Sequence, residues 1–580
     1  MDETRDVFRR LTRWGEAADL QAPLCEYPRP QFMRPDWLCL NGQWSFEICP
    51  DGEMPLRLTG AITVPFCPES MLSGAARGPR NGEMLWYGRS FSLPDGFMKD
   101  RLLLNFGAVD QWCEIFINGQ LVGTHEGGYL PFSVDITEFI DPHAENRISV
   151  SAYDLTDEGP YACGRQSLSP APGDVPAQSG IWQTVWLESV PDRYIRSVSI
   201  TPDLDRGSVR VEAPGCPQLR WVLFAEGRHI LNGLADSEGA AEFSVPDMRP
   251  WSPEDPFLYE LVLIFGKDIV KTYFAMRKIS VENGEILLNN KPVFLSGVID
   301  SGLWSDGLYT APSDEAMIYD ISTAKKMGFN LLRKYAKVEP LRWYYHCDRL
   351  GMLVWQDIPG GGSPGSRLWT YLIPRYTPFR VRDTSGYSRF GRGSGRDRAR
   401  FVTEMEQTEQ VLYNSPCVIC WSLFDEGRGQ FDSVRLSDRL KRLDPTRLVD
   451  HASGWLDQRV GDFKSVHVYS GRIRVPKDGR VFAVTMLDGF SCPSEDEAVP
   501  SGARRGKRRA EPGKLADAIV DLYEKRVIPA KERGMSVCIY MQLTDIGEER
   551  NGLISFDRAL VKAEQDVMLL LNKTLKGETT

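Results

Sequence analysis

A chain of 580 residues is far longer than one typical domain and can bury several hydrophobic cores. Its net charge of −10 and pI near 5.4 argue against general electrostatic binding to nucleic acid or to anionic membranes. The first 20 residues lack the apolar core of a signal peptide, and no segment has the apolar length that a bilayer requires, so we expect a cytoplasmic protein.

Cysteine and histidine indicate neither a metal site nor a disulfide framework. The twelve cysteines are scattered, and Cys417 and Cys420 lie in an apolar run, where they would pack as small hydrophobic side chains. The six histidines include no H-E-x-x-H pattern. We therefore expect no metal and no cofactor.

The first 280 residues have the pattern of β-sandwiches. From about residue 36 to 195, short alternating strands such as R-L-L-L-N-F are broken by glycine, proline and asparagine turns. A second strand-rich block, about 196 to 280, contains Y-E-L-V-L-I-F and predicts a small immunoglobulin-like sandwich. We place the domains at 1–195, 196–282 and 283–580.

After about residue 283 the pattern changes to strands alternating with amphipathic helices, which is typical of a parallel sheet. Eight strands are predicted, the number of a closed (β/α) barrel. They are 292–298, 330–335, 352–357, 417–424, 448–453, 464–469, 481–487 and 536–543. The predicted helices are 313–327, 400–412, 515–532 and 558–571.

The most informative stretch is 414–432, in which the apolar run 417–424 ends at two adjacent carboxylates, Asp425 and Glu426. The run is too short for a buried helix and too apolar for a loop, so it predicts a buried parallel strand. Its carboxylates would lie at the strand's C-terminal end, where barrel and doubly wound enzymes carry their active sites. The alternative is that Asp425 caps the next helix and Glu426 supports its first turn.

Other polar residues follow the ends of the predicted strands, and a barrel would bring them together in one pocket. The alternative for any one of them is a core polar group with satisfied hydrogen bonds. These residues are Asp300, Arg333, Tyr335, Gln356, Asp357, His451, His467, Tyr469, Asp488, Gln542 and Asp545.

Two long segments interrupt the barrel pattern. Residues 377–398 are rich in Arg, Gly and Ser, and residues 493–513 carry the basic run A-R-R-G-K-R-R at 503–509. Both follow strand ends on the expected active face, and loops of this length are commonly functional, so we interpret them as lids. The basic run has two further interpretations, a nuclear localisation signal or a solvated loop, and we prefer the loop.

Motifs in all three predicted domains resemble glycoside hydrolase family 2, the family of β-galactosidases, β-glucuronidases and β-mannosidases. F-G-A-V-D-Q and F-I-N-G-Q-L-V-G-T-H-E-G-G-Y-L-P-F-S-V-D-I-T are similar to its sugar-binding jelly-roll signature, and P-W-S-P-E-D-P-F-L-Y-E-L to its sandwich signature. The barrel contains M-G-F-N-L-L-R-K-Y, L-G-M-L-V-W-Q-D and N-S-P-C-V-I-C-W-S-L-F-D-E in the family's order. The resemblance covers nearly the whole chain and implies a jelly roll, an immunoglobulin-like sandwich and a TIM barrel.

The same resemblance implies the roles of the two carboxylates that a retaining glycosidase needs, an acid/base and a nucleophile. The acid/base Glu follows Asn in the family and corresponds to Glu426, but the dipeptide here is Asp425-Glu426. The nucleophile position at the end of the seventh strand corresponds to Met486, whose thioether cannot form a glycosyl ester. Asp488 is a candidate substitute, because residues two apart on an extended strand point the same way.

Further departures from the family pattern fall on the same face of the barrel. Tyr335 stands in place of a His, Met541 of a Thr, Arg428 of a Trp and Gly547 of a Glu. The framework motifs match while the reactive positions differ, which indicates a pocket altered for another task. Residues expected to contact the substrate are Asp300, Trp304, Arg333, Tyr335, Asp357, Arg428, His467, Tyr469, Met486 and Gln542.

Three functions follow from these observations. The first is an enzyme repurposed from retaining hydrolysis, a cyclase, lyase or isomerase that uses Glu426 as acid/base on a non-sugar metabolite. The second is a glycosidase in which Glu426 protonates the leaving oxygen and Asp488 or Asp425 activates water. The third is a carbohydrate-binding pseudoenzyme. We expect a small-molecule substrate, a glycoside or glycoside-like metabolite, and neither nucleic acid nor membrane as a partner. The sequence is compatible with a homo-oligomer.

Overall fold

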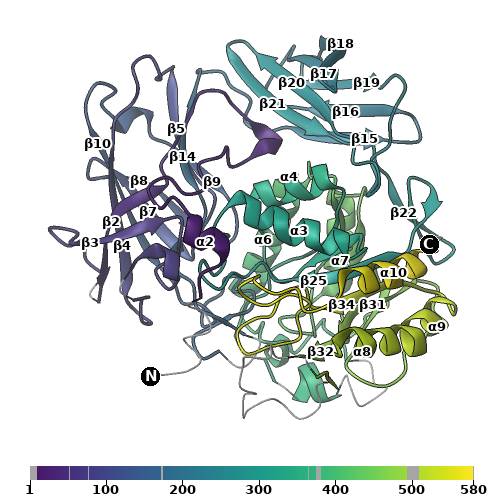
Figure 1. The fold of residues 1–580 in the computed structure, drawn as a ribbon. Helices are drawn as coiled ribbons and strands as arrows, with labels where there is room; N and C mark the ends of the chain where they lie inside the picture. The colour runs from purple at the N-terminus through teal and green to yellow at the C-terminus, as the bar shows by residue number, and fades with distance from the viewer. Residues whose placement is uncertain are drawn as a thin grey trace.

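The computed structural model describes residues 10–50, 52–75, 77–170, 174–363, 365–366, 368–373, 381–492, 508–511 and 513–578. The chain folds into two β-sandwiches and a parallel α/β barrel, which is the predicted fold class (Figure 1). In Figure 1 the first sandwich is purple to blue, the second is blue-green to teal, and the barrel runs from teal through green to yellow. Residues 503–507 of the basic run and 377–380 of the other long segment lie outside the described residues. No described helix has the length and apolar character needed to cross a bilayer.

The first sandwich packs a four-stranded sheet against a six-stranded one. In β7, Cys113, Ile115 and Ile117 are buried while the residues between them are partly exposed, so one face of the sheet is apolar. The smaller sheet has the order β1 (Trp37–Cys39), β14 (Val185–Val190), β5 (Arg101–Phe106), β9 (Phe132–Asp135). The larger has the order β3 (Gly60–Val64), β2 (Gly42–Cys49), β4 (Met84–Phe91), β10 (Asn146–Tyr153), β7 (Trp112–Ile117), β8 (Gln120–Glu126).

The second sandwich is smaller and has its own core. Along β20 the buried residues Tyr259, Leu261, Leu263 and Phe265 alternate with more exposed ones, as a half-buried strand requires. One sheet contains β15 (Ser199–Asp203), β16 (Ser208–Glu212) and β19 (Ala240–Ser244), and the other β18 (Arg228–Leu234), β17 (Arg220–Ala225), β20 (Tyr259–Phe265) and β21 (Asp268–Phe274). The small sheet β22 (Ile279–Glu282), β23 (Glu285–Leu288), β24 (Lys291–Pro292) leads into the barrel.

Eight parallel strands form the barrel, each within a few residues of its predicted range. β29 and β30 stand at the two ends of the hydrogen-bonded order and contact each other, which nearly closes the barrel. The order is β29 (Leu448–Asp450), β28 (Val418–Ser422), β27 (Leu353–Asp357), β26 (Leu331–Lys334), β25 (Leu295–Asp300), β34 (Met535–Met541), β31 (Val481–Asp488), β30 (Phe463–Val468).

Helices surround this barrel, and two of the predicted ones need correction. The predicted helix 515–532 is interrupted by a π-helical turn at Tyr523–Val527. The predicted start at 558 is wrong, because Arg558 has a left-handed φ of 59° within a turn and the helix begins at Gln565. The helices are α3 (Asp314–Lys326), α4 (Leu341–Leu350), α6 (Gly395–Leu412), α7 (Ser433–Leu443), α8 (Leu515–Leu522), α9 (Ile528–Lys531) and α10 (Gln565–Lys576).

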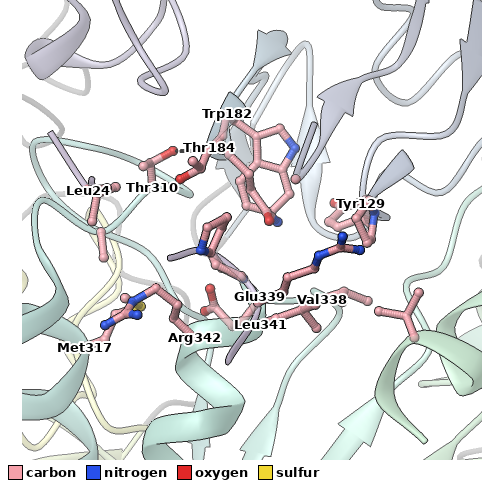
Figure 2. Close-up of a pocket in the computed structure, with 18 of the residues that line it drawn as sticks. Leu24, Tyr129, Trp182, Thr184, Thr310, Met317, Val338, Glu339, Leu341 and Arg342 are labelled. Atoms are coloured by element: carbon pink, nitrogen blue, oxygen red, sulfur yellow. Dashed lines mark hydrogen bonds between the residues drawn. The ribbon is translucent and has the colours of Figure 1, made fainter. Parts of the chain in front are cut away.

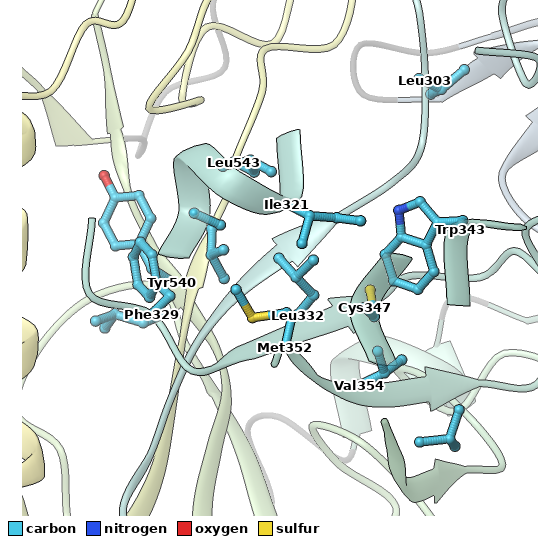
Figure 3. Packing of buried hydrophobic residues seen from close by; sticks show 14 of the residues in the cluster. Leu303, Ile321, Phe329, Leu332, Trp343, Cys347, Met352, Val354, Tyr540 and Leu543 are labelled. Atoms are coloured by element: carbon cyan, nitrogen blue, oxygen red, sulfur yellow. The ribbon is translucent and has the colours of Figure 1, made fainter. Parts of the chain in front are cut away.

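The largest core lies between the strands and these helices (Figure 3). Ile321 of α3 and Trp343 of α4 pack there together with Leu332 of β26 and Val354 of β27. The neighbouring Leu331 instead belongs to the cluster that fills the barrel interior. Both faces of these strands are therefore buried, and this explains their continuous apolar sequence.

A buried carboxylate joins the N-terminal segment to the first sandwich. Glu188 of β14 accepts hydrogen bonds from Tyr27 (2.7 Å), Arg29 (2.6 Å) and Arg34 (2.9 Å). Burial alone would raise the pKa of Glu188, but the guanidinium groups of Arg29 and Arg34 lower it to about 2. Arg34 also donates to Asp268 of the second sandwich, so this cluster couples both sandwiches.

A small cavity of about 40 Å³ lies where the first sandwich, the N-terminal segment and the barrel meet (Figure 2). Tyr129 and Trp182 contribute rings to its wall, and Thr310 donates to the carbonyl oxygen of Trp182. The charged groups at its edge have partners, because Arg342 binds Asp314 and Glu339 binds buried lysines. The cavity is a packing gap at this seam.

Removing the charge of Glu188 should destabilise the whole N-terminal half. Glu188→Gln leaves Arg29 without its carboxylate partner and Arg34 with Asp268 as its remaining one. Breaking a buried pair in this way costs about 3–5 kcal/mol. We expect a lower urea midpoint in equilibrium unfolding. Glu212→Gln, which disrupts the exposed pair with Arg210, is the matched control and should change the free energy of unfolding by less than about 1 kcal/mol. Equal effects of the two substitutions would contradict the role of the cluster.

Candidate active site

The C-terminal end of β28 carries the two carboxylates that the sequence singles out. After the strand ends at Ser422, the backbone N–H of Glu426 donates to the carbonyl oxygen of Ser453, at the end of the neighbouring strand. Glu426 has a left-handed φ of 52°, which turns the chain at the barrel mouth. The capping alternative is wrong, because α7 begins only at Ser433 and its N-cap is Asp432.

Asp425 is held by residues that follow or end β26. Arg333 donates to its Oδ1 at 2.8 Å and the hydroxyl of Tyr335 to its Oδ2 at 2.6 Å. Burial alone would raise the pKa of Asp425, but the guanidinium of Arg333 and the hydrogen bond from Tyr335 hold it below its usual value. The guanidinium of Arg333 also donates hydrogen bonds to both carboxylate oxygens of Asp357, each at 3.0 Å. Burial raises the pKa of Asp357 to about 6, against the opposing effect of Arg333.

Glu426 is held by two residues at the end of β30. Nδ1 of His467 is 3.0 Å from its Oε1, and the hydroxyl of Tyr469 donates to the same oxygen. Burial, together with the nearby carboxylate, raises the pKa of Tyr469 well above its usual value, so the phenol keeps its proton and acts as a donor. The Tyr469 oxygen is also 3.6 Å from the sulfur of Met486. The predicted residues Glu426, His467, Tyr469 and Met486 therefore lie together.

A cavity of about 480 Å³ opens beside these carboxylates. Barrel residues in its wall include Tyr335, Asp425 and Glu426, and Trp455 closes one side. The indole nitrogen of Trp455 donates to the backbone oxygens of Glu426 (3.0 Å) and Thr370 (2.6 Å). A cavity of this size and polarity fits a small-molecule ligand.

The first sandwich supplies part of this wall. Its segment 157–166 reaches the barrel, where the N–H groups of Cys163 and Gly164 donate to the carbonyl oxygen of Gly360. The guanidinium of Arg165 lies 5.2 Å above the ring of Tyr335 and 3.7 Å from Glu549. Sequence reasoning missed Arg165, because it is neither at a strand end nor in a family motif.

Several predicted residues lie elsewhere. Asp300 pairs at 2.7 Å with Lys334, whose ammonium lies over Trp343 of α4, so both face the helices rather than the barrel interior. The ring of Trp304 packs against Arg558.

Of three further predicted residues, Arg428 lines the cavity, while Gln542 and Asp488 are buried. Gln542 is buried and donates to Asn551 at 2.9 Å. Arg428 is exposed and lines the cavity. Asp488 is buried as the last residue of β31.

Three polar neighbours of the carboxylates were not predicted: Ser453, Trp455 and Thr485. The hydroxyl oxygen of Ser453 is 2.9 Å from Nε2 of His467 and 2.9 Å from the hydroxyl oxygen of Thr485. Serine and threonine carry no motif here, and only the proximity of strand ends could have suggested them. Among the described residues, no group of three or more His, Cys, Asp or Glu side chains is arranged to hold a metal ion.

Two protein-family models match the chain in order. The model of "Glycosyl hydrolases family 2, sugar binding domain" matches residues 72–191, and that of "Glycosyl hydrolases family 2, TIM barrel domain" matches residues 279–475. Together they cover more than half of the chain.

Curated relatives are similar at lower identity. A beta-galactosidase of Oenococcus oeni is 26% identical over 417 residues, 66% of this chain and 37% of that protein. A beta-glucuronidase of Paenibacillus borealis is 24% identical over 453 residues, 71% of this chain and 72% of that protein. The chain spans less than two fifths of the length of three beta-galactosidases that it matches, which are 37%, 39% and 38% covered.

Solved structures share the fold. The beta-glucuronidase of Ruminococcus gnavus in complex with uronic isofagomine has a TM-score of 0.74 at 17% identity, covering 96% of this chain and 99% of that one. A beta-glucuronidase of an uncultured Clostridium sp. has a TM-score of 0.73 at 17% identity, covering 93% and 98%. With both family models matched in the domains where the structure has a sandwich and a barrel, the chain belongs to glycosyl hydrolase family 2.

Proposed function

We propose that this chain is a glycosidase that hydrolyses a β-linked sugar, with Glu426 as proton donor to the glycosidic oxygen. The proposal rests on one observation: in a family 2 barrel, Glu426 lies at a strand end beside the cavity, with its Oε1 bound by His467 and Tyr469. The relatives are named for beta-galactosidase and beta-glucuronidase activity. These names favour a glycosidase over the expected reaction on a non-sugar metabolite, which no observation here supports.

Water is the proposed nucleophile, because Met486 occupies the position that the family resemblance assigns to the nucleophilic carboxylate. A retaining glycosidase forms a covalent ester on that carboxylate, and a thioether cannot do so. Direct attack of water on the anomeric carbon breaks the glycosidic bond, and the leaving oxygen takes the proton of Glu426. Such a single displacement inverts the anomeric configuration.

Asp488 is the proposed base that receives the proton of the attacking water. β31 remains extended through Asp488, so this side chain leaves the strand on the same side as Met486. Asp425 is less suited to this role, because Arg333 and Tyr335 hold its pKa low and a carboxylate of low pKa is a weak base. We assign Asp425 to stabilising the positive charge that develops on the sugar ring.

Loss of the acid should slow hydrolysis in a way that depends on the leaving group. Glu426→Gln cannot donate the proton, so kcat on an alkyl β-glycoside should fall about 10²–10⁴-fold. A dinitrophenyl glycoside needs little protonation and should lose much less. Steady-state kinetics on both substrates measures the difference. Glu406→Gln, on the outer side of α6, is the control and should leave both rates unchanged.

The stereochemistry of the product tests the role of Met486. Wild-type protein should release the α-anomer from a β-glycoside, as ¹H NMR shows in the first minutes before mutarotation. Met486→Glu restores a carboxylate at this position and should change the outcome to retention, whereas Met486→Gln has a similar size and should not. Retention by the wild type would disprove the displaced mechanism, and absence of turnover on a broad panel of aryl β-glycosides would disprove the glycosidase proposal.

A further inference from the structure

His467 connects Glu426 to a row of hydroxyl groups behind the cavity. Its Nδ1 is 3.0 Å from Oε1 of Glu426, and its Nε2 is 2.9 Å from Oγ of Ser453. The order of serine, imidazole and carboxylate is that of a hydrolase triad. Ser453, however, has no exposed surface and its hydroxyl also binds Thr485, so a substrate cannot reach it. The chain of hydrogen bonds from Thr485 through Ser453 and His467 therefore ends on Glu426 and does not contact a substrate directly.

We propose that His467 is a positioning residue for Glu426 and is held as the Nδ1–H tautomer. The proposal rests on the proposed role of Glu426 as proton donor. When Thr485 donates to Ser453 and Ser453 donates to Nε2, the imidazole proton lies on Nδ1 and points at Oε1 of Glu426. This N–H and the hydroxyl of Tyr469 then both donate to Oε1 of Glu426. The other carboxylate oxygen, Oε2, is the one that exchanges the proton with the substrate.

The charged and polar groups around the imidazole agree with this tautomer. Besides Glu426, Oδ1 of Asp425 lies 3.6 Å from Nε2, too far for a hydrogen bond that would draw the proton to that side. The Tyr469 oxygen is 3.4 Å from Nδ1, but its proton is directed at Glu426. The ring of Trp455 meets the imidazole edge-on and fixes its plane. The imidazole is thus fixed by Glu426 at Nδ1, by Ser453 at Nε2 and by Trp455 against the ring.

Kinetics of substituted proteins separates positioning from a merely structural role. His467→Asn retains an amide N–H near the position of Nδ1 and should keep kcat within about 10-fold, whereas His467→Leu should lower kcat by about 10²-fold with little change in KM. The side chain of His451 is as buried as that of His467 but accepts a hydrogen bond from the backbone N–H of Gln458, so His451→Leu is the control substitution. Equal losses in the Asn and Leu variants at 467 would overturn the proposal.

The tautomer can be measured without any turnover, so failure of the glycosidase proposal would be distinguishable. Selective ¹⁵N labelling of the six histidines and two-bond ¹H–¹⁵N spectra report which ring nitrogen carries the proton. We expect the Nδ1–H form for His467, assigned by its loss in His467→Asn, and a change to the Nε2–H form in Glu426→Leu. An Nε2–H signal in the wild type would contradict the proposal even if the protein hydrolyses glycosides.

A second, independent observation concerns two cysteines of the N-terminal region. Sγ of Cys25 lies 3.1 Å from Sγ of Cys39, and both residues are partly exposed, whereas the other ten cysteines are buried. Cys39 ends β1, and Cys25 belongs to the segment whose Tyr27 and Arg29 bind Glu188. A bond between the two sulfur atoms would tie this segment to the sandwich.

We infer that Cys25 and Cys39 form a modification site at which a low-molecular-weight disulfide, such as oxidised glutathione, makes an intramolecular disulfide. The thiolate of Cys25 attacks one sulfur of the oxidant and releases one thiol. Cys39, after losing its proton, attacks Sγ of Cys25 and releases the second, so one external disulfide is reduced to two thiols. The hydrogen bond with Cys39 lowers the pKa of Cys25, which favours Cys25 as the attacking group.

Intact-mass measurement of the full chain tests this inference. Treatment with oxidised glutathione should remove two hydrogens without adding glutathione, and peptide mapping should link Cys25 to Cys39. Cys39→Ser should instead accumulate one glutathione on Cys25. The urea midpoint should rise on oxidation of the wild type and not of Cys39→Ser. An unchanged mass of the wild type, or modification of the buried Cys113 in place of this pair, would overturn the inference.

Discussion

The barrel mouth depends on one buried guanidinium, that of Arg333. It donates to both oxygens of Asp357 on β27, to Asp425 after β28 and to the carbonyl oxygen of Thr485 in β31. A buried cation without such partners would cost several kcal/mol, so these strand ends must meet around it. The same guanidinium holds the carboxylate of Asp425, the neighbour of Glu426 in the chain, and thereby sets the distribution of charge at the site.

The proposed single displacement relies on that distribution of charge. Asp425 binds Arg333 and Tyr335, while the uncharged sulfur of Met486 lies 3.6 Å from the Tyr469 oxygen that binds Glu426. Glu426 is bound through its Oε1 by His467 and Tyr469. In the proposed reaction the protein therefore supplies an oriented acid and a fixed negative charge, and water supplies the new bond.

The barrel does not build this site alone. Arg165 reaches the ring of Tyr335 from the first sandwich, and the segment around it is anchored to the backbone of Gly360. The first sandwich is in turn joined to the N-terminal segment and the second sandwich through Glu188 and Arg34. Stability of the domain seams and the shape of the pocket are therefore linked, since a shift of the sandwich would move Arg165.

The amino-acid sequence by itself determined the eight barrel strands, because parallel strands buried on both faces read as apolar runs with abrupt ends. It also determined that Asp425 and Glu426 follow such an end. It placed the last helix seven residues too early, because the turn at Arg558 depends on a left-handed backbone that no local pattern announces. Element boundaries of this kind are set by tertiary context.

Only the tertiary structure decided which polar residues face the pocket. Asp300 and Arg333 both lie near the ends of adjacent strands, yet the first turns toward the helices and the second into the barrel mouth. In strands that are apolar on both faces, the sequence does not reveal the phase of side-chain alternation. The contacts of Arg165 with Tyr335 and of Ser453 with His467 join segments distant in the chain, and such contacts arise only when the domains and strand ends pack together.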